Sequence, residues 1–461
     1  MKHTIFQDAK VIIKFSSPIV ISSLLGMVSN FIGVLFVSGM GNNQLAAGSL
    51  AIVTVAIFTT LTFGILCSVG IKISHIKGAG ESPPSIGLWV KNGFWLAVIF
   101  AFPSSLLLNF GPDFLMLVGQ KQSIVVITKG YFYYSSLMMF PALINVAFLQ
   151  FFIGIGKPRF ILISSLVQLP INIGLFYFLI SGSIYTPPMG LSGVSCSILI
   201  SQTLCCLTIL YYIYINEEIK GYKVYSNFLR IDWEQCKELV KVGYPIGIQK
   251  SGEIGALAVA TYMMGSFGLV ALTASEIVSQ YTMITVIFTA SLSQSISILT
   301  SKSHGEGKTE LTNNYIKSSL LLMIAIFILF SLAFSIKPSF FVNAYLHVLS
   351  SDNRSIINLT IDLFIITTIT MFIDGTRNLL SGALRGLQDS RTPMLIGTLS
   401  LWLISLPLAY ILGFVESLGP VGLKIGFVIG IVITTLILGK VYLQRMTSLS
   451  NQKAREAFSN I

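Results

Sequence analysis

The stretch SLLLMIAIFILFSLAFSI, residues 319–336, contains no charged side chain from end to end. A helix needs about 20 mostly apolar residues to cross the hydrocarbon core of a bilayer. The rest of the chain resembles this stretch, because 54% of its 461 residues are hydrophobic, only 10% are charged and the mean hydropathy is +0.81. Soluble domains carry roughly 25% charged residues. The composition therefore predicts that lipid surrounds most of the chain.

Twelve segments have the length and polarity of membrane spans. We expect helices, because the alternating strands of about ten residues that build a barrel are absent from the sequence. The first apolar segment has no small-residue cleavage site behind a short apolar core, so we interpret it as a retained helix and not a signal peptide. The expected spans are residues 15–38, 45–71, 88–109, 127–152, 160–181, 190–214, 243–265, 275–299, 315–336, 360–383, 394–414 and 419–440.

The positive charges predict the topology. If both termini are cytoplasmic and the spans alternate, the outer loops hold only Lys121, Lys129, Lys337 and Arg354. Most of the other basic residues then lie in cytoplasmic segments, as the positive-inside rule requires for a bacterial-type inner membrane. They include Lys72, Lys77, Lys157, Arg159, Lys220, Lys223, Arg230, Lys302, Arg385, Arg391 and Lys440. The net charge of +11 is therefore a topology signal, and its dispersal argues against nucleic-acid binding.

Reactive motifs are missing from the sequence. The five cysteines lie in or beside apolar segments without metal-type spacing, and the four histidines form no triad or metal motif. No phosphate-binding glycine loop of the ATPase type is present. We therefore predict a protein that is not an enzyme, has no cofactor, acts on a small molecule and works as a monomer in the bilayer.

An internal repeat joins the two halves of the chain at a constant separation of about half its length. Pro18 matches Pro245 near the start of spans one and seven, and we call the separation of these two prolines the repeat offset. The other identities at the same offset are Gly41 with Gly268, Leu45 with Leu272, Ala47 with Ala274, Ser74 with Ser301, Gly78 with Gly305 and Gly80 with Gly307. Six spans are an even number, so the halves are parallel repeats of the kind that move against each other in secondary transporters.

The repeat predicts two lobes. We expect an N-terminal lobe of six helices over residues 1–215, a cytoplasmic linker over 216–241, a C-terminal lobe of six helices over 242–445 and a cytoplasmic tail over 446–461. Residues 233–242 have the pattern of an amphipathic lead-in to span seven at the inner surface. Two cytoplasmic turns, GIGKPR at 154–159 and GALRGLQDSRTP at 382–393, combine glycine, arginine and proline in the manner of helix punctuation.

Four ionisable residues lie deep within predicted spans, all in the second half: Lys250 and Glu253 in span seven, Asp374 and Arg377 in span ten. Such residues are candidates for function by default. In each span the acid and base are three residues apart and share one helix face. Two interpretations remain open. Glu253 and Asp374 bind H⁺ or Na⁺ as the coupling ion, or the four charges form a neutral network that locks the two helices together. Gln249, Gln280, Tyr281 and Asn378 lie at depths where they can line the same cavity.

These residues resemble a known family. The chain is similar to the multidrug and toxic compound extrusion (MATE) family, in its NorM-like branch, over nearly its whole length. The matching segments are residues 45–47 (LAA), residues 243–245 (GYP), Glu253 and residues 374–386, of which GALRG at 382–386 is the most specific. Span five adds Gln168 and Asn172 within QLPIN.

The resemblance implies an all-α membrane protein with two six-helix lobes that form a V-shaped central cavity. It also implies an antiporter that exports organic compounds, often cationic, in exchange for Na⁺ or H⁺. Glu253 and Asp374 match the cation-binding carboxylates of the second lobe, and Gln168 and Asn172 match polar residues of a first-lobe site.

The chain also departs from the family pattern. Gly33 stands where family members carry an acid in the first helix, and Asn30 is the strongly polar residue nearby. Thr370 stands where an aromatic hydroxyl is expected, and the bases Lys250 and Arg377 are unexpected. These departures favour coupling through the second lobe alone. They also keep open an alternative, a flippase or dedicated exporter of a lipid-linked, anionic or natural-product substrate with unusual or absent cation coupling.

Overall fold

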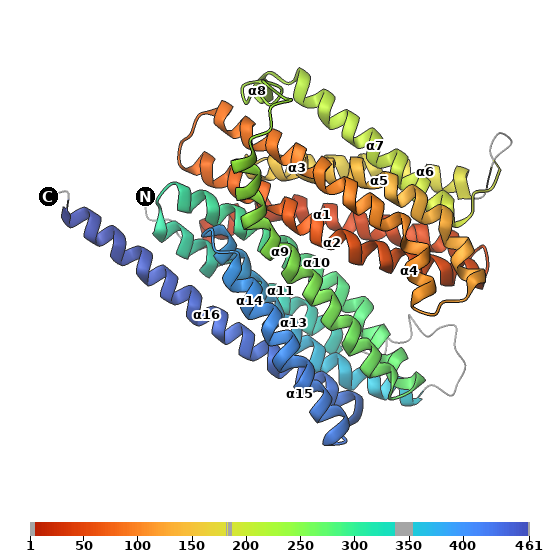
Figure 1. The fold of residues 1–461 in the computed structure, drawn as a ribbon. Coiled ribbons are helices and arrows are strands. Elements are labelled where there is room, and N and C mark those ends of the chain that lie inside the picture. Colours follow the sequence, from red (N-terminus) through yellow and green to blue (C-terminus); the bar gives the residue numbers. More distant parts are fainter. Residues whose placement is uncertain (1–4, 181, 183–186, 337–353, 460–461) are drawn as a thin grey trace. The chain divides into compact units, whose positions relative to one another are not determined.

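The computed structural model describes residues 5–180, 182, 187–336 and 354–459, and nearly all of them are helical (Figure 1). They form two compact units. The first unit comprises Ser17–Gly247, and the second comprises Met1–Ser16 together with Ile248–Ile461.

The first unit contains most of α1 (Ile5–Ser38) and the beginning of α9 (Trp233–Gly265). Between them lie α2 (Asn42–Gly78), α3 (Pro83–Asn109), α4 (Gly111–Leu117), α5 (Gln122–Gly154), α6 (Arg159–Ile180), α7 (Leu191–Ile215) and the single turn α8 (Glu217–Lys220). Helix α5 is at the centre and packs on α2, α3 and α7. Its aromatic side chains, among them Phe132, Phe148, Phe151 and Phe152, are fully buried in the core.

The second unit contains the rest of α9, α10 (Leu269–Gly305), α11 (Thr309–Ile336), α13 (Arg354–Gly386) and α16 (Gly419–Ser459). One further span is continuous from α14 (Arg391–Ser400) through the π-helix η1 (Leu401–Ser405) and α15 (Leu406–Tyr410) to the π-helix η2 (Ile411–Val415). Helix α13 is central and packs on α10, α16 and α11. It occupies the place in this unit that α5 occupies in the first.

Each expected span lies within one of these helical segments, apart from Gly190, which precedes the first residue of α7, and residue 181, which is outside the described residues. In the described chain, eleven helical spans are long and apolar enough to cross a membrane. Helix α9 is not among these eleven, because Gln249, Lys250 and Glu253 lower its hydropathy, but it contains the seventh expected span. The predicted all-helical membrane fold is therefore confirmed. The first glycine turn does end α5 at Gly154, whereas α13 continues through Gly382 and Arg385 and ends only at Gly386, so the predicted second turn begins four residues later than expected.

The predicted repeat is present in the backbone. Helices α2 and α10 are equal in length, and both their first and their last residues are separated by the repeat offset. Each is preceded by a glycine in a positive-φ conformation, Gly41 at 103° and Gly268 at 99°. Each is followed by another, Gly80 at 77° and Gly307 at 67°, in a region of φ that a side chain disfavours. The repeat therefore keeps glycine at these four positions because the backbone there has a positive φ.

Helices α1 and α9 each begin in one unit and continue in the other. The beginning of α1 belongs to the second unit, where Ser318 Oγ donates to the Ile5 carbonyl at 2.9 Å and Ile12 is fully buried. The beginning of α9 belongs to the first unit, where Leu239 is fully buried. Residues 233–242 are therefore the packed start of α9 and are continuous with the seventh span.

Candidate functional site

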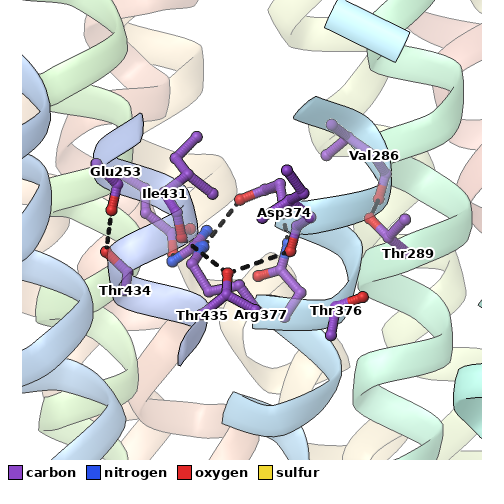
Figure 2. A network of polar contacts seen from close by, with 12 residues as sticks. Glu253, Val286, Thr289, Asp374, Thr376, Arg377, Ile431, Thr434 and Thr435 are labelled. Atoms are coloured by element: carbon purple, nitrogen blue, oxygen red, sulfur yellow. Dashed lines mark hydrogen bonds and ion pairs between the residues drawn. The ribbon is translucent and has the colours of Figure 1, made fainter. Parts of the chain in front are cut away.

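The four charges predicted in spans seven and ten meet within the second unit. Helix α9 supplies Lys250 and Glu253, and α13 supplies Asp374 and Arg377. Lys250 Nζ lies 2.9 Å from Glu253 Oε2, on the same helix face. Arg377 then joins the two helices, with Nη1 at 2.8 Å from Glu253 Oε1 and Nε at 2.8 Å from Asp374 Oδ1. Figure 2 shows the guanidinium lying between the two carboxylates.

Arg377 is the most enclosed member of this group. Its side chain is 4% exposed, compared with 15% for Glu253, 25% for Asp374 and 36% for Lys250. The fork of an arginine side chain suits two carboxylates at once, because its N–H groups are fixed in one plane. The buried guanidinium of Arg377 is therefore the centre of the network, and it pairs with both acids.

Amides extend the network beyond the charges. Gln249 donates from Nε2 to Glu253 Oε1 at 3.1 Å and accepts at Oε1 from Arg385 Nη2 at 2.7 Å. Asn378 Nδ2 donates to Asp374 Oδ2 at 3.1 Å. A hydrogen-bonded path thus runs from Asn378 through both acids to Arg385.

A third helical segment closes one side of the site. A Cβ placed on Gly397 of α14 would lie 3.2 Å from Gln249 Nε2 and 3.6 Å from Arg377 Nη1, so the absence of a side chain leaves room for both. Trp402, in η1, donates its indole N–H to the Gly252 carbonyl of α9 at 3.2 Å. π-Helical turns are frequent at functional sites, and here one places an aromatic donor beside the turn of α9 that bears Glu253.

Other predicted residues of the second half make contacts outside this network. Thr370 donates to the Ile366 carbonyl of its own helix at 2.8 Å. Gln280 is exposed on α10, and Tyr281 packs against Phe364 with ring centroids 5.7 Å apart. By contrast, Asn378 was predicted as a cavity residue and does hydrogen-bond within the network.

Arg385 is the member that the sequence did not predict. The sequence places it in a cytoplasmic turn after the tenth span, whereas it lies within α13 and is only 9% exposed. Its spacing contains a signal, since Arg377 and Arg385 are separated by two steps of four along α13, the spacing of side chains on one helix face.

The first-unit polar residues form a different environment. Asn172 is buried and donates to Ser29 Oγ at 3.1 Å, and Gln168 lies beside the Cys205 thiol. Asn30 is exposed. A Cβ on Gly33 would lie 3.4 Å from the Phe176 ring, so the position of the missing acid borders an aromatic side chain.

Both acids are engaged by neighbouring donors in this arrangement. Hard cations take several oxygen ligands, and no group of three or more His, Cys, Asp or Glu residues converges anywhere in the described chain. Every carboxylate oxygen of Glu253 and Asp374 already accepts a hydrogen bond, and Arg377 contributes positive charge between them. The geometry matches the locking network that the charge pattern offered as one of two interpretations.

The fold and this network define a polytopic membrane protein built from two repeats, with a charged site inside the second. The MatE family model matches residues 18–178 and 245–411, two segments that begin at the paired prolines of the repeat, Pro18 and Pro245. The chain belongs to this family, as its sequence motifs predicted.

Relatives and solved structures agree with this assignment. A probable multidrug resistance protein NorM from Rhizobium meliloti (strain 1021) is 27% identical over 91% of this chain and 90% of its own length. The structure of a MOP superfamily transporter from Pyrococcus furiosus is similar with a TM-score of 0.85 at 17% identity, over 96% of this chain and 97% of that one. The Vibrio cholerae MATE transporter VcmN in its bent form matches with a TM-score of 0.85 at 16% identity, over 96% and 98%. At these identities the solved structures establish the fold alone.

Proposed function

We propose that the protein is a secondary active transporter that exports small organic compounds across the inner membrane, with both termini in the cytoplasm. The observation that supports this most strongly is the charge network of α9 and α13, because deeply buried ionisable groups in membrane spans are costly and mark functional sites. The names of the relatives, which describe probable multidrug resistance proteins, support export of diverse compounds. Membership of a transporter family argues against an enzyme.

Coupling to H⁺ or Na⁺ would act through Glu253 and Asp374. Arg377 binds both acids, so a proton or cation that neutralises either carboxylate competes with the guanidinium. Losing one partner of a buried ion pair costs about 3–5 kcal/mol, which corresponds to a shift of roughly a hundredfold to several thousandfold in a two-state equilibrium. Neutralisation would thereby release α13 from α9, and substrate export would accompany the change.

Transport in inside-out membrane vesicles tests this proposal. We expect an imposed H⁺ or Na⁺ gradient to drive uptake of fluorescent organic cations by the wild-type protein. Glu253→Gln and Asp374→Asn should each reduce uptake to the level of vesicles without transporter. Asp362→Asn removes an exposed acid from the same helix α13 and should leave uptake unchanged. Wild-type uptake in both network variants, at equal protein levels, would disprove coupling through these acids.

A second candidate is an exporter of an anionic or lipid-linked compound with unusual or absent cation coupling. The side chain of Lys250 is the most exposed of the four charges, and Arg385 adds a further base to the hydrogen-bonded path. The Pyrococcus furiosus transporter is described as having a binding pocket of reverse polarity, which suggests a different function for that protein. Uptake of anionic dyes in preference to cationic dyes, without dependence on either gradient, would favour this candidate. Lys250→Gln should then abolish it.

A further inference from the structure

A cavity of about 260 Å³ lies in the first unit where α7 ends and the segment before α9 begins. Its lining comes from the last turn of α7, from α8 and from the following loop. The lining residues are Ile213, Tyr214, Ile219, Lys220, Lys223, Val224, Tyr225 and Ser226. The walls are mainly apolar, the two charged residues among them are both lysines, and neither belongs to the network described above.

The loop is held against the membrane-spanning helix. Tyr225 donates its hydroxyl to the Leu210 carbonyl of α7 at 2.7 Å, which fixes the loop beside the last two turns of that span. Burial raises the pKa of the Tyr225 hydroxyl, so the proton needed for this bond stays in place. The cavity and its lysines therefore lie beside the last turns of α7, at the end of that apolar span.

The backbone of Lys223 is unusual. Its φ is 51°, a left-handed conformation that residues other than glycine and asparagine rarely adopt. Two turns hold it there, because Lys223 N donates to the Lys220 carbonyl at 2.8 Å and its own carbonyl accepts from Ser226 N at 2.9 Å. The turn therefore holds the backbone of Lys223 in one conformation at the wall of the cavity.

The nearby acids are already paired. Glu217 lies 2.8 Å from Lys220, with both side chains largely exposed, and Glu218 pairs with Lys157. Neither acid lines the cavity. An exposed pair of this kind contributes little, so an anion can replace Glu217 as the partner of Lys220.

An apolar stripe leads from the membrane span to the cavity. Leu204, Leu207, Tyr211 and Tyr214 follow one face of α7 at helical spacing, and all four are exposed. Tyr214 also lines the cavity. Tyrosines at the end of a span are typical of the membrane interface, and basic pockets at that level bind anionic lipid headgroups.

We propose that this cavity, with Lys220 and Lys223 at its wall and the α7 stripe beside it, binds an anionic phospholipid of the surrounding leaflet. The headgroup phosphate lies between the two lysine ammonium groups. The acyl chains lie along the exposed side chains of α7. This continuity of a charged cavity with a lipid-facing stripe favours a lipid over a free phosphate compound.

The test is thermal melting of the purified full-length protein in non-ionic detergent, followed by tryptophan fluorescence. We expect added phosphatidylglycerol to raise the Tm, whereas phosphatidylcholine and glycerol 3-phosphate do not. The double variant Lys220→Gln/Lys223→Gly should need about thirtyfold more phosphatidylglycerol for the same shift, since each charge near an anionic surface contributes about fivefold. Glycine suits the left-handed conformation at 223, so this variant should fold as well as the wild type without lipid.

The matched control is Lys121→Gln/Lys129→Gln, which removes two exposed lysines at the start of α5 in the same unit and should behave as the wild type. Three results would each overturn the proposal. Phosphatidylcholine could raise the Tm as much as phosphatidylglycerol, the double variant could respond as the wild type does, or glycerol 3-phosphate alone could give the full shift. The last result would identify a site for free anions.

Discussion

At the scale of single residues, Arg377 determines how the charges of the site are arranged. The sequence placed two acids and two bases on two helices, which left open whether the acids converge on a cation or pair with the bases. The structure places the guanidinium 2.8 Å from each acid, so both carboxylates depend on one side chain. That dependence makes Arg377 a stability determinant as well as a candidate coupling element.

Arg377→Ala should lower the stability of the protein by about 3–5 kcal/mol, because it leaves two enclosed carboxylates with one base fewer. The measurement is the melting temperature in detergent. Arg391→Ala, which removes an exposed arginine at the start of α14, is the control and should change little. Adding Asp374→Asn to Arg377→Ala should recover part of the loss. An unchanged melting temperature for Arg377→Ala would mean that water in a cavity solvates the acids.

At Gly33, in the first unit, the question is whether the local environment could accommodate the acid that family members are expected to carry there. Gly33→Asp would place a carboxylate against the Phe176 ring and Val194, a largely apolar environment. We expect a loss of more than about 2 kcal/mol from this buried unpaired charge. Gly33→Ala adds only a Cβ at ordinary contact distance, 3.4 Å or more, and should be neutral or stabilising. Equal melting of the two variants would show that the acid reaches water.

At the scale of helices, the central helix of the second unit depends on close packing. The GALRG run was predicted to lie in a turn, but it forms the last residues of α13, which ends at Gly386. Gly382 has a different role, because a Cβ on it would lie 2.4 Å from the Ser293 carbonyl oxygen of α10. Ser293 in turn donates its hydroxyl to the Asn378 carbonyl, so the two backbones approach directly. This contact holds α13, and with it Asp374 and Arg377, at a fixed distance from α10.

Gly382→Ala should therefore push α10 and α13 apart and cost about 1–3 kcal/mol, as overpacking usually does. Gly439→Ala in α16 is the matched control, since its nearest neighbour would be a Leu380 side-chain carbon at 3.9 Å. That variant should be neutral or slightly stabilising, because alanine is the better helix former. Melting in detergent compares the two, and a tolerated Gly382→Ala would contradict the close packing.

At the scale of the whole molecule, the two units are connected by exchanged helix ends. Helices α1 and α9 are equivalent in the repeat, and each begins in one unit and continues in the other. Pro18 and Pro245 lie close to the points where the helices pass between units. Proline interrupts the hydrogen bonding of a helix and permits a bend there. The two prolines occupy equivalent positions of the internal repeat, so both helices contain this interruption at the same place.

Because of this exchange, two substitutions at equivalent positions of the repeat should destabilise different units. Ile12 and Leu239 are separated by the repeat offset and are fully buried, the first in the core of the second unit and the second in the core of the first. Each change to alanine should cost about 2–5 kcal/mol. Hydrogen–deuterium exchange should show lost protection in α16 for Ile12→Ala and in α2 and α3 for Leu239→Ala. Loss of protection in the same unit for both variants would contradict the exchange.

The sequence by itself determined that lipid surrounds most of the chain, where the spans lie, how the two halves repeat and which two helices carry the buried charges. These follow from hydropathy, helix length and spacing, which are properties of contiguous segments. It also identified Glu253, Asp374 and Arg377 as candidate site residues, because charges inside an apolar span are conspicuous without any partner.

Only the tertiary structure decided which of these groups meet. The pairing of Arg377 with Glu253, the inclusion of Arg385 through Gln249 and the space that Gly397 leaves for Gln249 all join residues that are far apart in the sequence. Helical periodicity orders side chains along one helix, but it does not fix the rotation of one helix against another. That rotation is set by close contacts such as Gly382 against Ser293, and it determined that the two acids share an arginine.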